Sequence, residues 1–304
     1  MPHDSFRHEA LIYRDAEELL ATAVPFLREG IEAGEPALVA VRGANATLLQ
    51  GELGAEADRV GFADMETLGR NPARIIPFWR DFVDEHGGGP VRGIGEPVWP
   101  GRGPAEIDEC QRHESLLNVA FSALPAWTLL CPYDAGGLDD EVLAAVAHSH
   151  RAVARDGQKE SSTSFAPDLE WFGGSLPDPP RETSYEFDRT GLFGVRQRVG
   201  WAAKSAGLPA EATVDLIVAA SELAANSIVH GGGAGTLHIW REPDRLLVEI
   251  VDRGSIEEPL VGRIKPDPAR AGGRGLWLAN QLCDLVQIRS GATGTAVRLQ
   301  MSLG

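Results

Sequence analysis

The chain has 304 residues, a length at which a single hydrophobic core usually gives way to two domains. Hydrophobic residues make up 43% and charged residues 24% of it, which argues against a disordered, collagen-like or coiled-coil chain. The 44 acidic residues outnumber the 28 basic ones and give a formal net charge of −16. Such a field disfavours direct binding to nucleic acid or to an anionic membrane.

The cysteines and the N-terminus bear on the compartment. Cys110, Cys131 and Cys283 are widely spaced, so a single chain can build neither a disulfide framework nor a Cys-x-x-Cys zinc site from them. The first residues contain no basic segment followed by an apolar run, and no stretch approaches the roughly 18 apolar residues of a membrane span. We therefore expect a soluble cytoplasmic protein that does not contact a membrane.

A change in composition divides the chain near its middle. Three prolines and two glycines fall within residues 173–180, and such a stretch cannot continue a helix or a central strand. We therefore expect a first domain over residues 1–165, a linker over residues 166–183 and a second domain over residues 184–304.

The first half alternates strand-like and helix-like segments. Asp15 and Glu18 have the spacing of a capping box, and an apolar stripe at helical period follows them as far as Gly34. The segments expected next are a strand at 37–41, a helix at 44–53, a strand at 127–131 and a helix at 139–153. This alternation predicts a mostly parallel α/β domain. No Gly-Lys-Ser/Thr follows the strand at 37–41, so a phosphate loop is missing.

The second half is expected to contain a long helix that ends at His230, just before three glycines. Glu222, Asn226 and His230 are spaced four residues apart and therefore share one face of this helix. A carboxylate, an amide and an imidazole suit a divalent metal with its waters, or a carboxylate placed to accept a proton. A solvated polar stripe would have the same spacing, so both interpretations remain open at this point.

Two glycine-bearing segments follow. An apolar strand at 246–251 runs directly into Asp252 and Gly254. A carboxylate there can accept a hydrogen bond from an amine such as adenine N6, while glycine lets a ring approach the backbone, although an ordinary Asp-x-Gly turn is the alternative. Gly273, Arg274 and Gly275 then lead into a helix, whose N-terminus offers N–H donors to a phosphate.

The second half also contains a polar stretch and a final pair of strands. The polar stretch at 257–270 lies between the two glycine-bearing segments and could fold over a ligand. A strand hairpin is expected at 286–299, with its turn at 291–294.

Taken in order, these motifs resemble the four boxes of the GHKL ATPase superfamily over about residues 184–303. The matching phrases are Glu222-x-x-x-Asn226-x-x-x-His230, Asp252-x-Gly254, Gly273-x-Gly275 and Gly294-Thr295. The resemblance implies a two-layer α/β sandwich that binds ATP and Mg²⁺. The cofactor-binding residues it implies are Asn226, His230, Asp252, Gly254, Gly273, Arg274, Gly275, Leu276 and Thr295, of which Asn226 would hold the metal.

Within that superfamily the phrase Gly273-Arg274-Gly275-Leu276-Trp277-Leu278 and the short lid are most similar to the anti-sigma-factor kinases. By this resemblance Asp252 binds the adenine amine, and Glu222 is the catalytic base toward a serine of an anti-sigma antagonist. One departure is Ser227, because alanine usually follows the asparagine of the first box. It is small, and we expect the site to tolerate it.

Phrases of the first half are similar to the MEDS sensory domain over about residues 6–167. They are His8 with Tyr13, Gly30-Ile31-x-x-Gly34-Glu35, Gly95-Glu96-x-x-Trp99, Glu114-x-x-Leu117-Asn118, and Cys131-Pro132-Tyr133-Asp134 ahead of His148 and His150. This resemblance implies a RecA-like α/β fold without a phosphate loop, and the sensing of a small molecule or a protein signal.

Cys131, His148 and His150 are residue types of a metal or redox cluster, and Cys110 and His113 could add to it. Core packing is the alternative, because cysteine is among the most buried residue types. The sequence does not decide between the two.

Together these features favour a signal-responsive anti-sigma regulatory factor that controls a sigma factor by phosphorylating an antagonist protein. A homodimer is compatible with this hypothesis. A sensor histidine kinase with His113 as acceptor is a second hypothesis. It fits less well, because about 70 residues separate His113 from the ATPase domain. A third is a non-catalytic module that binds a sigma factor in a nucleotide-dependent way.

Overall fold

The computed structural model describes residues 6–87, 89–123, 127–166, 175–180, 184–267 and 273–303. The chain divides into two compact units, Met1–Phe172 and Gly173–Gly304. Of the predicted linker, residues 167–174 and 181–183 lie outside the described part.

The first unit is built on a seven-stranded sheet. In spatial order its strands are β3 (Val60–Asp64), β2 (Ala37–Val41), β4 (Val91–Gly95), β5 (Trp127–Asp134), β1 (Arg7–Tyr13), β6 (Ala152–Arg155) and β7 (Gln158–Ser161). Every pair is parallel except β6 with β7. The expected mostly parallel α/β domain is therefore confirmed.

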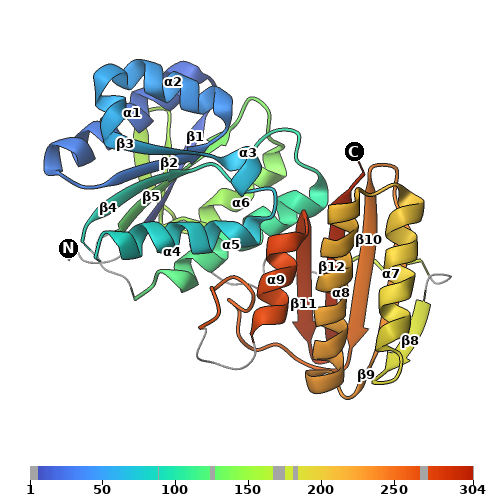
Figure 1. Ribbon diagram of the computed structural model, residues 1–304. Helices are drawn as coiled ribbons and strands as arrows, with labels where there is room; N and C mark the ends of the chain where they lie inside the picture. The colour runs from blue at the N-terminus through green and yellow to red at the C-terminus, as the bar shows by residue number, and fades with distance from the viewer. Residues whose placement is uncertain are drawn as a thin grey trace. The chain divides into compact units, whose positions relative to one another are not determined.

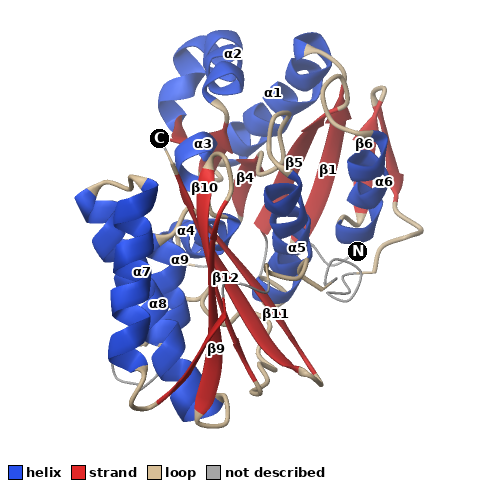
Figure 2. Cartoon of the chain, turned by 90° about the vertical axis from the view of Figure 1, so that its right-hand side faces the viewer, coloured by secondary structure: helices blue, strands red, loops and turns tan. Residues whose placement is uncertain are grey.

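Helices cover both faces of this sheet, as Figures 1 and 2 show. Helices α1 (Ala16–Ala33) and α2 (Gly43–Leu53) lie on one face, and α4 (Ile75–Glu85), α5 (Pro104–Ala120) and α6 (Asp140–Ser149) lie on the other. The short helix α3 (Met65–Leu68) and two 3₁₀ turns, Gly54–Arg59 and Pro72–Arg74, complete the connections.

Helix α1 begins and ends at the residues that the sequence indicates. The side chain of Asp15 accepts a hydrogen bond of 3.0 Å from the backbone N–H of Glu18, which satisfies one free donor of the first turn. Gly34 ends the helix with a φ of +72°, a left-handed conformation that glycine adopts without strain. Pro25 lies inside the helix, which continues through it.

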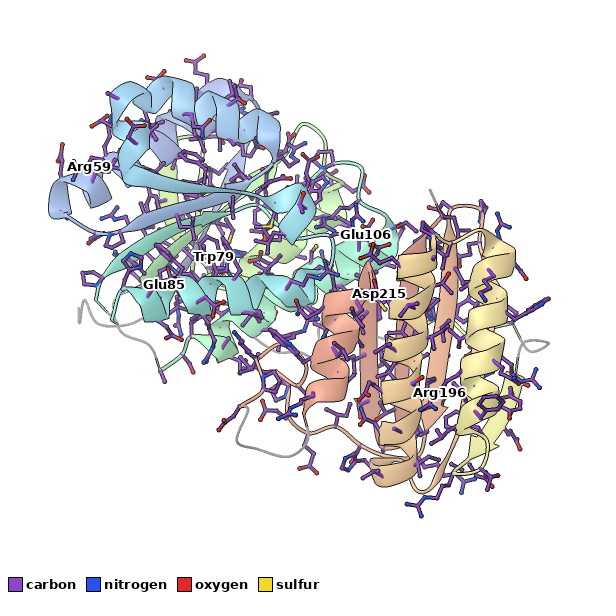
Figure 3. All side chains as sticks on the ribbon, viewed as in Figure 1. Arg59, Trp79, Glu85, Glu106, Arg196 and Asp215 are labelled. Carbon is purple, nitrogen blue, oxygen red and sulfur yellow. The ribbon has the colours of Figure 1, made fainter. Side chains whose placement is uncertain are left out.

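Two glycines of β4 make room for the large ring of Trp79 on α4. A Cβ atom at Gly93 or Gly95 would lie 3.1 or 3.2 Å from ring atoms of Trp79, closer than packed side chains normally approach. Trp79 points inward and is buried, whereas Glu85 at the end of the same helix is exposed (Figure 3). Glycine at alternate positions of the strand thus lets α4 pack a tryptophan directly on the sheet.

The turn between β2 and α2 closes around a carboxylate of the chain itself. Glu96 is fully buried and accepts hydrogen bonds from the backbone N–H of Arg42 (3.0 Å) and from its Nε (3.1 Å). The amide of Asn45 donates to the same carboxylate at 2.9 Å. Protein groups therefore fill the place where a phosphate loop would stand between strand and helix.

The predicted helix at 139–153 is wrong at its C-terminal end. Helix α6 stops at Ser149, His150 is extended with φ −116° and ψ 133°, and residues 152–154 pair with β1 as a parallel strand. Pairing with a distant strand decides the conformation here, and local helical periodicity could not show it.

The second unit is a five-stranded antiparallel sheet covered on one face by three helices (Figures 1 and 2). In spatial order its strands are β11 (Leu285–Gly291), β12 (Gly294–Ser302), β10 (Arg245–Asp252), β9 (Ala234–Arg241) and β8 (Ser184–Asp188). The helices are α7 (Leu192–Ala206), α8 (Ala210–His230) and α9 (Arg274–Leu282). This arrangement confirms the expected two-layer α/β sandwich and its final hairpin.

Helix α8 is the central helix of that layer. By length and composition it is apolar enough to cross a membrane, and no other described helix is. Its side chains at Leu216, Ala219 and Leu223 instead belong to the core that the helices form with the sheet. Packing in the core accounts for this apolar character.

Candidate functional site

A cavity of about 330 Å³ lies where α8, the end of β10 and the beginning of α9 meet. Eight of the predicted site residues line it: Asn226, His230, Asp252, Gly254, Gly273, Gly275, Leu276 and Thr295. Apolar side chains including Leu223, Ile250 and Val297 form the rest of its wall. A mostly apolar cavity of this size with a few polar groups is typical of a small-molecule site.

Two predicted site residues do not line the cavity, namely Glu222 and Arg274. Glu222 lies one helical turn before Asn226, and a Cβ atom at Gly275 would be 3.3 Å from the Glu222 Oε2 and 2.9 Å from the Asn226 Nδ2. The carboxylate of Glu222 therefore lies beside the first turn of α9, next to the cavity. Arg274 is exposed at the start of α9.

Asp252 is held in place by two donors. The hydroxyl of Ser227 donates to Asp252 Oδ2 at 2.6 Å, and the backbone N–H of Gly254 donates to Oδ1 at 2.8 Å. An ionised carboxylate has about four lone-pair sites. Two of them are in use, so the half-buried Asp252 can still accept a hydrogen bond from an amine in the cavity.

Ser227 is a cavity residue that the sequence motifs did not identify. It is fully buried, and its hydroxyl also lies 3.2 Å from the carbonyl oxygen of Leu223 one turn earlier. Its bond to Asp252 spans 25 residues of sequence. The only signal in the sequence was that serine stands where the resemblance leads one to expect alanine.

Glycines surround Asp252 because its neighbours leave no room for side chains. A Cβ atom at Gly231 would overlap the Asp252 carboxylate, and one at Gly294 would overlap the Asp252 carbonyl oxygen. A Cβ atom at Gly254 would lie 2.7 Å from the carbonyl oxygen of His230. Glycine at these positions therefore lets three segments of backbone meet at the carboxylate.

Thr295 fixes the backbone that follows Asp252. Its hydroxyl donates to the carbonyl oxygen of Gly254 at 2.9 Å and lies 2.7 Å from the hydroxyl of Ser290. Ser290 in turn accepts from the backbone N–H of Ile256 at 2.8 Å. These bonds tie the loop after β10 to the final hairpin, which explains why threonine follows the glycine there.

The beginning of α9 brings a positive dipole end to the cavity. Gly273 caps the helix with a φ of +75°, and Gly273, Gly275 and Leu276 all line the cavity. The first N–H groups of a helix have no partner within it and attract anions. No lysine or arginine is found among the described residues of the lining, and Asp252, Glu257 and Glu258 add negative charge. A polyphosphate in this cavity would therefore need a bound cation.

Asn226 is placed to supply a ligand to such a cation. It lines the cavity, and its amide lies beside the first turn of α9, where a Cβ atom at Gly275 would be 2.9 Å from its Nδ2. Amide and carboxylate oxygens, completed by water, are ordinary ligands of Mg²⁺. The residues present thus fit a nucleotide with Mg²⁺: Asp252 for the base, Asn226 for the metal and the N-terminus of α9 for the phosphates.

The predicted lid is irregular and anchored. Turns occupy residues 259–263 of the described stretch 257–267, and the amide of Asn280 on α9 donates to the carbonyl oxygen of Gly262 at 2.9 Å. Gly262 has a φ of +71°, and a Cβ atom there would lie 2.9 Å from the Cβ of Leu276. The remainder of the predicted lid, residues 268–270, lies outside the described part.

Two family comparisons bear on this chain. Residues 7–151 match MEDS, the methanogen/methylotroph, DcmR sensory domain, and residues 189–301 match the histidine kinase-like ATPase domain. No curated protein matches the chain. The second match spans every residue of the cavity. The chain therefore carries an N-terminal MEDS sensory domain and a C-terminal histidine kinase-like ATPase domain of the GHKL type.

Proposed function

We propose that this chain is a signal-responsive anti-sigma regulatory factor of the cytoplasm. In this proposal the second unit binds ATP with Mg²⁺ and phosphorylates a serine of an anti-sigma antagonist, and thereby controls a sigma factor. The observation that carries it is the convergence of Asn226, Asp252 and the N-terminus of α9 on one cavity, with Glu222 beside it. The first unit supplies the sensory input.

Each residue has a distinct task in the proposed reaction. Asp252 accepts the hydrogen bond of the adenine amine, and the glycines around it admit the ring. Asn226 orients the metal, and the N-terminal turn of α9 binds phosphate oxygens. ATP with Mg²⁺ supplies an activated phosphoryl group whose charge the metal offsets. Glu222, next to that turn, accepts the proton of the attacking serine hydroxyl.

The histidine kinase hypothesis is less well supported. A phosphoacceptor histidine must reach the terminal phosphate of the nucleotide, and His113 is fully buried on α5. The non-catalytic binding module remains as the alternative, because the same cavity would serve it. The two functions differ in whether Glu222 acts as a catalytic base.

Transfer of labelled phosphate from ATP separates these functions. We expect the full-length chain to place label on a serine of a co-purifying antagonist, and Glu222→Gln to lower that rate by about 10²–10⁴-fold while ATP binding stays nearly unchanged. Glu211→Gln is the matched control, since Glu211 is exposed in the first turn of the same helix and far from the cavity. Label on a histidine of the chain would favour the second hypothesis, and no transfer would favour the third.

A further inference from the structure

Four polar side chains meet in the interior of the first unit, apart from the nucleotide cavity. His8 comes from β1, Cys131 from β5, Glu114 from α5, and His150 from the connection between α6 and β6. One ligand atom from each lies within 4.8 Å of the others. All four residues are at most 1% exposed.

The topology of the sheet brings these residues together. Strand β1 lies between β5 and β6, and its Ala10 pairs with Cys131 while its Glu9 pairs with Ala152. Side chains of a strand alternate between faces, so His8 lies on the same face as Ala10 and Cys131. Helix α5 packs on that face and brings in Glu114 (Figure 2).

The distances among these atoms are short. Oε2 of Glu114 lies 2.9 Å from Nε2 of His8 and 3.2 Å from Nε2 of His150. The sulfur of Cys131 lies 3.4 Å from Nε2 of His8. A tetrahedral ion with bonds of 2.0–2.3 Å would separate its ligand atoms by about 3.3–3.8 Å. Shifts of less than about 1 Å would therefore open the cluster around an ion.

The hydrogen bonding of His150 directs its Nε2 into the cluster. Nδ1 of His150 lies 2.9 Å from the carbonyl oxygen of Val146, which can only accept, so this nitrogen carries the ring proton. Nε2 then faces a carboxylate oxygen of Glu114 at 3.2 Å, so that both atoms are placed to bind the same ion.

In the described part of the chain the ion-pair partners of Glu114 are the two histidines, and no lysine or arginine pairs with it. Both oxygens of Glu114, Nδ1 of His8 and Nε2 of His150 are buried without a hydrogen-bond partner of good geometry. A buried carboxylate is costly to the fold unless hydrogen bonds or a cation satisfy it. A bound cation would remove this cost.

We propose that His8, Glu114, Cys131 and His150 bind one divalent transition-metal ion of the Zn²⁺ class. Imidazole, thiolate and carboxylate are the side chains that bind zinc, and a thiolate disfavours Mg²⁺ and Ca²⁺. The thiol releases its proton to water as the ion binds, and the two negative ligands then balance the charge of the ion. The bond from His150 Nδ1 to Val146 orients the ring, as outer hydrogen bonds do in zinc sites.

The four ligands leave no position for a substrate, as in structural or regulatory zinc sites rather than catalytic ones. The ion would join β1, β5, α5 and the connection after α6. Of the residues that the sequence singled out, Cys131 and His150 belong to this cluster, whereas His148, Cys110 and His113 are not among its four.

Metal titration of the untagged full-length chain, without nucleotide, tests the proposal. We expect one equivalent of Zn²⁺ per chain by elemental analysis. After removal of Zn²⁺ with a chelator, Co²⁺ should give a thiolate-to-metal charge-transfer band and the strong visible bands of a tetrahedral site. Less than one equivalent of Zn²⁺, or a Co²⁺ spectrum without the thiolate band, would overturn the proposal.

Substitutions locate the site. Cys131→Ser should weaken Zn²⁺ binding by more than about 100-fold, because loss of a direct ligand exceeds the 10–100-fold that an outer partner costs. Cys110→Ser is the matched control: Cys110 is equally buried in the same unit, but its thiol donates to the carbonyl oxygen of Pro97 at 3.1 Å. If Cys131→Ser fails to fold, Glu114→Gln replaces it. Equal Zn²⁺ affinity in the ligand and control variants would contradict the assignment.

Discussion

Asn226 is the residue on which the binding of polyphosphate depends most. The described lining of the cavity contains no basic side chain, so the metal must offset the charge of the phosphates. We expect Asn226→Ala to lower affinity for ATP in the presence of Mg²⁺ by at least about tenfold and to abolish phosphate transfer. Calorimetric titration with and without Mg²⁺ measures this.

In the same titrations the wild-type chain should bind ATP weakly when Mg²⁺ is chelated, and Asn226→Ala should show little further loss there. Tight ATP binding by the wild-type chain without a divalent ion would mean that backbone groups alone bind the phosphates. The assignment of Asn226 as the metal ligand would then be wrong.

Ser227 positions Asp252 through a hydrogen bond of 2.6 Å. A hydrogen bond to a charged group contributes about 1.5–3 kcal/mol, and water can partly replace this one because Asp252 is half-buried. We therefore expect Ser227→Ala to weaken ATP binding by about threefold to tenfold, with the rate at saturating ATP unchanged. Nucleotide titrations and saturation kinetics measure the two quantities.

A double-mutant cycle makes the test specific. In an Asp252→Asn background the same Ser227→Ala change should have a smaller effect on ATP affinity, since the carboxylate that it orients is gone. Equal effects in both backgrounds would show that Ser227 acts by packing and not through Asp252.

The final hairpin, β11 to β12, shows how an element depends on two glycines to different degrees. Gly294 has a φ of +129°, and a Cβ atom there would overlap the Asp252 carbonyl oxygen, whereas Gly291 has open space and an ordinary backbone conformation. We expect Gly294→Ala to lower the free energy of unfolding of the second unit by about 1–3 kcal/mol, and Gly291→Ala to change it by about 0.5 kcal/mol or less. Denaturant unfolding of the two variants compares them directly, and equal stability would contradict this account of the turn.

The sequence predicts a helix or strand well when the residues that determine it lie close together in the chain. The glycine boxes, the capping of α1 and the face shared by Asn226 and His230 follow from local spacing. In the structure Asp15 caps α1, and Asn226 and His230 line the same cavity. The predicted C-terminal end of α6 was wrong because residues 152–154 pair with β1, which lies more than a hundred residues earlier. Register between distant strands leaves no trace in local periodicity.

The two polar clusters of the chain show the same limit. The Ser227 hydroxyl and Asp252 are 25 residues apart, and His8 and Cys131 are 123 apart. The sequence gives the residue types in both cases, but only parallel pairing of β1 with β5 brings His8 next to Cys131. Long-range pairing of this kind was the information that motif reasoning lacked.

At the scale of the whole molecule, the two units should respond to different ligands. A ligand that binds only the folded state stabilises by about 2.7 kcal/mol at a hundredfold excess over its dissociation constant. For a unit the size of residues 173–304 this corresponds to a rise of roughly 10 °C in melting temperature. Differential scanning calorimetry of the full chain should therefore show that ATP with Mg²⁺ raises one unfolding transition and leaves the other in place.

The Asn226→Ala variant identifies which transition belongs to which unit. Its nucleotide-dependent shift should disappear, while the transition that ATP does not move should stay at its wild-type temperature. Zn²⁺ should move the transition of the first unit in both the wild-type chain and Asn226→Ala, since the Zn²⁺ ligands lie in that unit. If ATP with Mg²⁺ shifted both transitions equally, binding energy would be shared between the units and independent stability would be excluded. A signal at the first unit could then change the activity of the second through the same shared free energy, because such coupling is reciprocal.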